Sequence, residues 1–225
     1  MGKFIELTAK DGHTFEAYEA KPEGKPRGGL VVIQEIFGVN PHIQWVSDGY
    51  AADGYHVLAP AVFDRAERGV QLGYGKDGFE QGRAIRQAIS IDDMLLDIAA
   101  TVDALKGAGK VGLVGYCMGG SLAWLSAAKV PGLSACIGYY GGNIAGQLDL
   151  TPHCAVMLHF GAEDTGIPLA DAEKVKAALE PKGTPVFIYP GAGHAFNRFG
   201  NHAWHEPSAT LARERSLTLL REAVG

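Results

Sequence analysis

The sequence predicts an α/β protein whose mainly parallel sheet carries helices on both faces. Short apolar runs of strand length alternate with helical patterns from residue 30 onward, and this alternation is typical of parallel sheets. Glycine-rich loops follow several of the apolar runs, as short strand-to-helix connections require. With 225 residues and 47% hydrophobic content, the chain can bury one large core. We therefore expect a single domain over residues 1–225.

The expected elements follow in chain order. Residues 4–8 and 14–19 resemble an opening antiparallel pair, and the Pro- and Gly-rich residues 21–29 form a loop. Another loop is expected over residues 64–82. The remaining strands are expected at residues 30–34, 56–59, 111–116, 135–139, 155–160 and 186–189, and the helices at 43–52, 91–105, 122–128, 169–179 and 211–224.

Composition narrows the classes of function. With a net charge of −5, the chain lacks the excess of basic residues that is typical of nucleic-acid-binding proteins. No run approaches the roughly 18 apolar residues of a membrane span. The start of the chain lacks an apolar signal region, and three cysteines without a Cys-x-x-Cys pair favour reduced thiols in the cytoplasm. We expect no metal and no cofactor. The expected partner is a small-molecule substrate, with the protein a monomer or small homo-oligomer.

A candidate nucleophile lies where the apolar run 111–116 meets a helical pattern. The turn reads Gly115-Tyr116-Cys117-Met118-Gly119-Gly120. This is the pattern of a nucleophile elbow, a sharp strand-to-helix turn, with cysteine in place of the usual serine. Glycines let such a turn close, and the helix N-terminus favours a thiolate. The alternative is a buried apolar cysteine in a glycine-rich turn.

Two further residues complete a catalytic triad in the chain order nucleophile, acid, histidine. Asp164 follows the apolar run 155–160, and His194 follows the run 186–189 in a glycine-rich loop. Parallel strands bring their carboxyl ends to one edge of the sheet, so the three side chains should meet. Asp164 would orient the imidazole, and His194 would take the proton of Cys117. Taken singly, Asp164 could be a helix cap and His194 an ordinary loop residue.

Several segments together resemble the dienelactone hydrolase (carboxymethylenebutenolidase) family, a cysteine-dependent branch of the α/β-hydrolases. They are the cysteine elbow, the Gln34-Glu35-Ile36-Phe37-Gly38 segment after the first long strand, Gly138-Tyr139-Tyr140-Gly141, and Gly193-His194-Ala195-Phe196 with Arg198. The resemblance extends along nearly the whole chain and implies the α/β-hydrolase fold.

Glu35 stands at the end of a strand expected to be buried, where desolvation makes a carboxylate a better proton acceptor. The resemblance implies that Glu35 contacts Cys117 in the resting enzyme and helps to deprotonate it when substrate binds. It also implies that the backbone N–H groups of Ile36 and Met118 form the oxyanion hole. The alternative for Glu35 is an ion pair or a cap on a surface loop.

The resemblance also implies a small lactone substrate with a free carboxylate, which an arginine fork binds well. Arg198 matches a carboxylate-binding arginine of the family by position. A second family arginine falls where this chain departs from the family pattern, reading Pro60-Ala61-Val62-Phe63. Arg83 is the candidate there, with Arg86 close behind, although both could be solvated helix residues. Tyr139 and Phe37 are expected in the pocket wall.

We therefore expect a hydrolase that cleaves a small carboxylate-bearing enol lactone or ester through a Cys117-His194-Asp164 triad and an acyl-enzyme. A thioesterase or general small-ester hydrolase on the same scaffold is the alternative. A ligand-binding module without catalysis is a third reading, but such a module has no need of the triad together with Glu35.

Overall fold

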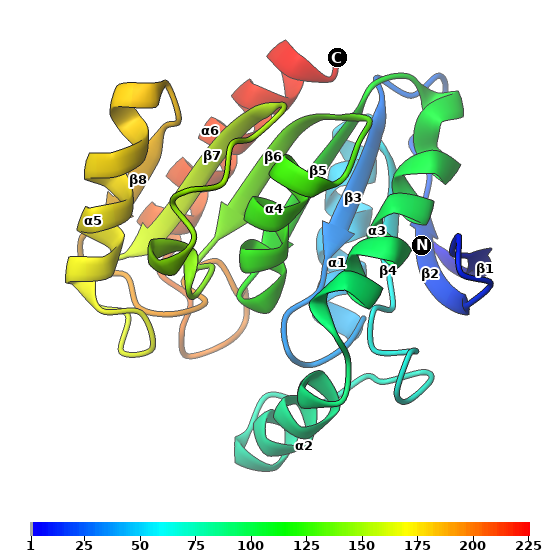
Figure 1. Cartoon of the computed structure of the whole chain (residues 1–225), viewed down its shortest axis with the longest axis horizontal. Coiled ribbons are helices and arrows are strands. Elements are labelled where there is room, and N and C mark those ends of the chain that lie inside the picture. Colours follow the sequence, from blue (N-terminus) through cyan, green and yellow to red (C-terminus); the bar gives the residue numbers. More distant parts are fainter. Residues whose placement is uncertain (1) are drawn as a thin grey trace.

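The computed structural model describes residues 2–225 and is built on an eight-stranded sheet in the order β1-β2-β4-β3-β5-β6-β7-β8 (Figure 1). β2 pairs antiparallel with β1 and with β4, and every other pairing is parallel. The predicted α/β class and the opening antiparallel pair are therefore confirmed. The strands are β1 (Lys3–Thr8), β2 (Thr14–Ala20), β3 (Gly29–Ile33), β4 (His56–Pro60), β5 (Val111–Tyr116), β6 (Leu133–Tyr139), β7 (Ala155–Gly161) and β8 (Val186–Tyr189).

Helices cover both faces of the sheet. α1 (Pro41–Ala52) and α6 (Glu206–Ala223) lie behind it in Figure 1, whereas α3 (Ile91–Leu105), α4 (Met118–Lys129) and α5 (Leu169–Leu179) lie in front. α2 (Lys76–Gln87) projects below the carboxyl ends of the central strands. Short 3₁₀ helices occur at Lys106–Ala108, Ile144–Gly146 and Glu180–Lys182.

The central strands form because their residues are apolar throughout. Every residue of β3 and of β5 is buried, as expected for parallel strands covered on both faces. Side-chain caps begin two of the flanking helices: Asn40 accepts from the N–H of Ile43 at α1, and Ser90 accepts from the N–H of Asp93 at α3. Each cap satisfies a backbone donor that has no partner within the helix. The result is a rigid sheet whose carboxyl edge carries the candidate site.

Three helix boundaries differ from those expected. α2 begins at Lys76, inside the expected loop 64–82. The helix is polar and buries only Gly82 and Ile85, so few apolar residues marked its first turns as helical. α4 begins at Met118 rather than at residue 122. Its first turn was not expected to be helical because it contains two glycines. α6 begins at Glu206 rather than at residue 211. Its first turn was not expected to be helical because it carries few large apolar residues.

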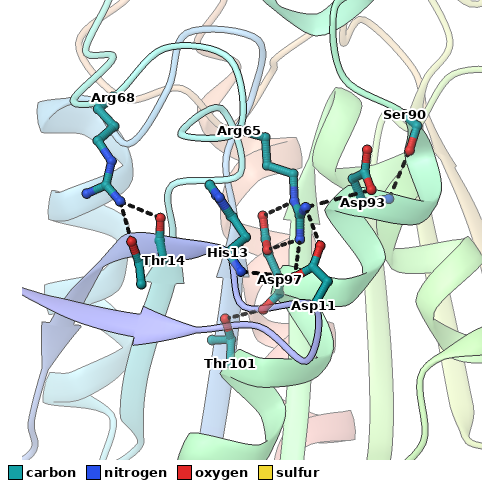
Figure 2. A network of polar contacts seen from close by, with 9 residues as sticks. All are labelled: Asp11, His13, Thr14, Arg65, Arg68, Ser90, Asp93, Asp97 and Thr101. Carbon is teal, nitrogen blue, oxygen red and sulfur yellow. Dashed lines mark hydrogen bonds and ion pairs between the residues drawn. The ribbon is translucent and has the colours of Figure 1, made fainter.

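An ion-pair network fastens the β1–β2 turn to α3 (Figure 2). Arg65 donates to both carboxylate oxygens of Asp97, at 2.7 and 3.0 Å, and to Asp11 at 2.7 Å. Asp97 is fully buried, and Arg68 donates separately to the Thr14 carbonyl. A buried carboxylate needs such pairing, so Arg65 holds the antiparallel end of the sheet against the helical layer.

Two further properties bear on the class of protein. Along residues 2–225, no helix combines the length and apolar character that crossing a bilayer requires. In the same part of the chain, His, Cys, Asp and Glu side chains do not gather in threes as a metal site would need.

Candidate active site

Cys117 lies at a sharp turn between β5 and α4. Its backbone is strained, with φ of 55° and ψ of −115°. A Cβ on Gly115 would lie 1.9 Å from the Gly119 carbonyl oxygen, and a Cβ on Gly119 would lie 2.5 Å from the Ile33 carbonyl oxygen. Only glycine fits at both positions, because either contact is far inside van der Waals distance. The side chain of Cys117 is half-buried at the N-terminus of α4, as the elbow pattern predicts.

Asp164 and His194 lie beyond the carboxyl ends of β7 and β8. The Asp164 Oδ2 atom is 2.7 Å from Nδ1 of His194, and its Oδ1 atom accepts from the N–H groups of Gly166 and Ile167. The carboxylate is therefore fixed on both oxygens, and it leaves Nε2 of the imidazole as the ring nitrogen available to Cys117.

The imidazole of His194 binds its proton tightly. Burial opposes the charged form, but hydrogen bonds to Asp164 and to Cys117 outweigh it and raise the pKa of His194 to about 10. The structure thus places the three predicted triad residues in one connected group. A proton held on His194 places a positive charge beside the sulfur of Cys117.

Glu35 follows β3 and is almost fully buried, 1% exposed. Its Oε1 accepts from Nη2 of Arg198 at 2.7 Å, and its Oε2 accepts from Nε of Arg198 at 3.2 Å and from the Tyr74 hydroxyl at 3.0 Å. Among residues 2–225, no hydrogen bond joins Glu35 to Cys117. This differs from the resting contact that the family resemblance implies, because Arg198 and Tyr74 occupy the carboxylate instead.

Aromatic rings enclose the Glu35–Arg198 pair. The guanidinium carbon of Arg198 lies 3.9 Å from the ring centroid of Tyr74 and 5.5 Å from that of Phe37. Burial and the charge of Glu35 raise the pKa of Tyr74, so its hydroxyl remains a donor to the carboxylate. Burial lowers the pKa of Arg198, but the contact with Glu35 outweighs this and leaves it raised. Tyr74 lies in the expected loop, and no sequence pattern singled it out.

The main-chain donors expected to bind an oxyanion come from two different turns. Ile36 follows β3, and Met118 is the first residue of α4. Neither N–H donates to another group of residues 2–225. The β3 end and the elbow are in direct contact through Gly119 and the Ile33 carbonyl. Two unpaired donors beside Cys117 are what an oxyanion hole requires.

The remaining expected substrate-binding residues lie in different surroundings. Arg83 is exposed on α2, and the Arg86 guanidinium donates to the Ile89 carbonyl at 2.9 Å. α2 nevertheless meets the site through its backbone, because a Cβ on Gly82 would lie 1.9 Å from the Ile36 carbonyl oxygen. The role of Arg83 in binding stays a prediction.

Tyr140, rather than the expected Tyr139, lies beside the triad. The Tyr139 hydroxyl lies 2.7 Å from Oγ of Ser216 on α6, so this side chain belongs to the rear face of the sheet. The ring of Tyr140 lies 4.9 Å from that of His194, and its hydroxyl donates to Asn197. Tyr140 therefore supplies the wall beside the triad that was expected of Tyr139.

Known proteins resemble this chain along most of its length. Residues 15–224 match the model of the dienelactone hydrolase family. A carboxymethylenebutenolidase of Pseudomonas putida is 32% identical over 224 residues, covering 96% of this chain and 94% of the relative. A putative carboxymethylenebutenolidase of Synechocystis sp. is 35% identical over 191 residues, covering 74% of each chain.

A solved structure agrees with these sequence matches. The crystal structure of a putative dienelactone hydrolase from Klebsiella pneumoniae superposes with a TM-score of 0.82 at 26% identity, covering 97% of both chains. Together with the cysteine elbow and the sheet order, these matches show that the chain is an α/β-hydrolase that belongs to the dienelactone hydrolase family.

Proposed function

We propose that this hydrolase cleaves a small enol lactone or ester bearing a free carboxylate, with Cys117 as the nucleophile. Membership of the family makes the chain an enzyme that acts on ester or lactone bonds. The observation that carries the finer proposal is the connected group of Cys117, His194 and Asp164, with the buried Glu35–Arg198 pair beside it.

In the first half of the reaction, Sγ of Cys117 attacks the acyl carbon while His194 holds the proton that the thiol has given up. The new S–C bond pushes the carbonyl electron pair onto oxygen, where the N–H groups of Ile36 and Met118 stabilise the charge. Collapse of this intermediate breaks the ester C–O bond. The leaving oxygen takes the proton from His194, and an acyl group remains on sulfur. Asp164 keeps the imidazole oriented throughout, through the 2.7 Å contact with Nδ1.

In the second half, water replaces the leaving group. His194 removes a proton from the water, the hydroxide oxygen attacks the thioester carbon, and the C–S bond breaks. The proton on His194 returns to the sulfur, and the carboxylic acid leaves. Every proton and electron pair is accounted for by the triad and one water molecule, so this sequence of steps calls for no further reactant.

The Glu35–Arg198 pair makes the reaction sensitive to substrate charge. A substrate carboxylate that binds Arg198 competes with Glu35 for the same guanidinium fork. A displaced Glu35 is then a free base close to the elbow. This is the arrangement in which the carboxylate can assist the ionisation of Cys117, as the family resemblance implies.

A substrate panel tests the proposal. Turnover of the dienelactone 4-carboxymethylenebut-2-en-4-olide should exceed turnover of its methyl ester and of a small thioester, measured as kcat/KM on the intact chain. Cys117→Ala should lower turnover of the lactone by about three orders of magnitude or more while thermal unfolding stays close to wild type. A thioester preference would favour the thioesterase alternative. Full activity of Cys117→Ala would overturn the nucleophile assignment.

A further inference from the structure

A cavity lies between α1 and α6, the two helices that Figure 1 shows at the rear of the sheet. Its volume is about 270 Å³. Several aromatic rings line the wall, and none of the triad residues or Glu35 does so. The wall includes Trp45 and Tyr50 of α1, Tyr116 and Tyr139 at the ends of β5 and β6, and Trp204.

The mouth of this cavity carries large aromatic side chains that remain in solvent. Trp45 is 54% exposed and Phe199 is 59% exposed. Their rings are stacked with centroids 5.5 Å apart, and Phe199 also contacts Trp204 edge-on at 5.4 Å. Exposed apolar surface that is gathered at the rim of a pocket marks a site for an apolar ligand more often than scattered single residues do.

Two polar side chains of the cavity wall, Asn197 and Arg213, have N–H groups that can donate to a ligand. Asn197 accepts from the Tyr140 hydroxyl through Oδ1, which leaves its amide N–H groups available. Arg213 uses Nη2 for the Asp53 carboxylate and the Gly49 carbonyl, and no other hydrogen bond of its guanidinium is made within residues 2–225. A ligand with an acceptor oxygen can therefore bind these N–H groups.

The charge of the cavity is already balanced. The Arg213 guanidinium forms an ion pair with Asp53 at 2.5 Å and lies 4.7 Å from the ring centroid of Tyr50. A carboxylate ligand would have to compete with Asp53, or else be held without a countercharge of its own. A neutral oxygen can use the free donors without disturbing that pair.

From these features we infer that the cavity binds a small neutral aromatic molecule with an acceptor oxygen, such as an aryl ketone or aryl ester. A dry apolar cavity of about 150 Å³ holds benzene, so a cavity of about 270 Å³ accommodates a single substituted ring. This site is separate from the catalytic centre, and the inference stands whether or not the proposed lactone reaction is correct.

Calorimetric titration of the intact protein with acetophenone tests the site. Binding should be saturable at one site, with a negative heat-capacity change from burial of apolar surface. Benzoate has nearly the same shape but carries a charge, and it should bind at least tenfold more weakly. Equal or tighter binding of benzoate would overturn the neutral-ligand assignment, and absence of acetophenone binding would overturn the site.

Four single variants locate the bound molecule. Ala209 lines the cavity on α6, so Ala209→Leu fills it with three extra carbons and should weaken acetophenone binding about tenfold or more. Ala177→Leu, an exposed position on α5, is the matched control and should leave the affinity unchanged. Trp204→Leu removes an aromatic part of the cavity wall and replaces Ala209→Leu in the test if that variant fails to fold.

Phe37→Leu alters only the Glu35–Arg198 site. Loss of binding in Phe37→Leu, but not in Ala209→Leu, would place the ligand at the catalytic centre and overturn the inference.

Discussion

The carboxylate of Glu35 and the guanidinium of Arg198 form a two-pronged ion pair across 163 positions of the sequence. Both side chains are buried, with relative exposures of 1% and 9%. The pair joins the loop after β3 to the loop that carries His194, so it fixes two sides of the catalytic centre at once. A substrate that binds Arg198 in place of Glu35 would therefore also weaken the connection between these two loops.

Removing one member of this pair should destabilise the protein. Arg198→Met leaves the Glu35 carboxylate buried without a countercharge, a loss of about 3–5 kcal/mol in the free energy of unfolding. The double variant Glu35→Leu/Arg198→Met should recover most of that loss, because no isolated charge remains. Urea denaturation measures both values, with the exposed Arg221→Met as control. A loss below about 1 kcal/mol in the single variant would mean that water reaches the pair.

Arg198 should also discriminate between charged and neutral substrates. Arg198→Lys keeps a positive charge for Glu35 but loses the fork that matches a carboxylate. We expect its KM for the anionic lactone to rise roughly ten- to a hundredfold, the effect of a charge-assisted hydrogen bond worth about 1.5–3 kcal/mol. The KM for the methyl ester should change little. Equal losses for both substrates would show that Arg198 only packs the His194 loop.

Asp164 should act on catalysis through the orientation of His194. Asp164→Asn can retain the acceptor for the N–H groups of Gly166 and Ile167, so the loop should keep its shape. The amide no longer stabilises the correct tautomer and charge of the imidazole, and kcat should fall by about three to four orders of magnitude. Steady-state kinetics measure the loss, and thermal unfolding provides the check on folding. A decrease of only a few-fold would make Asp164 a loop anchor.

The sequence predicted the triad because parallel strands bring their carboxyl ends to one edge, whatever the length of chain between them. It could not predict which partner Glu35 would take. That choice depends on where the His194 loop places Arg198, and a guanidinium binds any carboxylate within its reach. The contact of Tyr74 with Glu35 was not predicted for a related reason, since Tyr74 belongs to an irregular segment with no periodicity.

The choice between Tyr139 and Tyr140 could not be predicted for a similar reason. Neighbouring residues at a strand end tend to point to opposite sides of the sheet, so the sequence indicates that only one of the two side chains faces the nucleophile. It does not indicate which of them faces the nucleophile. The packing of α6 decides this, because Ser216 of that helix forms a hydrogen bond with the Tyr139 hydroxyl. The early start of α2 was not predicted because the helix is polar and buries only Gly82 and Ile85.

The last prediction concerns the dependence of stability on pH. The pKa of His194 rises from 6.5 to about 10 on folding, mainly because the hydrogen bonds to Asp164 and Cys117 outweigh burial. A group whose pKa is raised in the folded state stabilises it fully below its unfolded pKa. That stabilisation is lost as pH rises from 6.5 through about 10. Water reaches the 33% of the side chain that is exposed, and its screening reduces the expected contribution to about 1–2 kcal/mol.

The free energy of unfolding of the wild type should therefore fall more steeply between pH 7 and pH 10 than that of His194→Asn. Lysines, tyrosines and the other cysteines titrate in both proteins, so the difference between the two curves isolates His194. Parallel curves would mean that the imidazole is neutral in the resting enzyme.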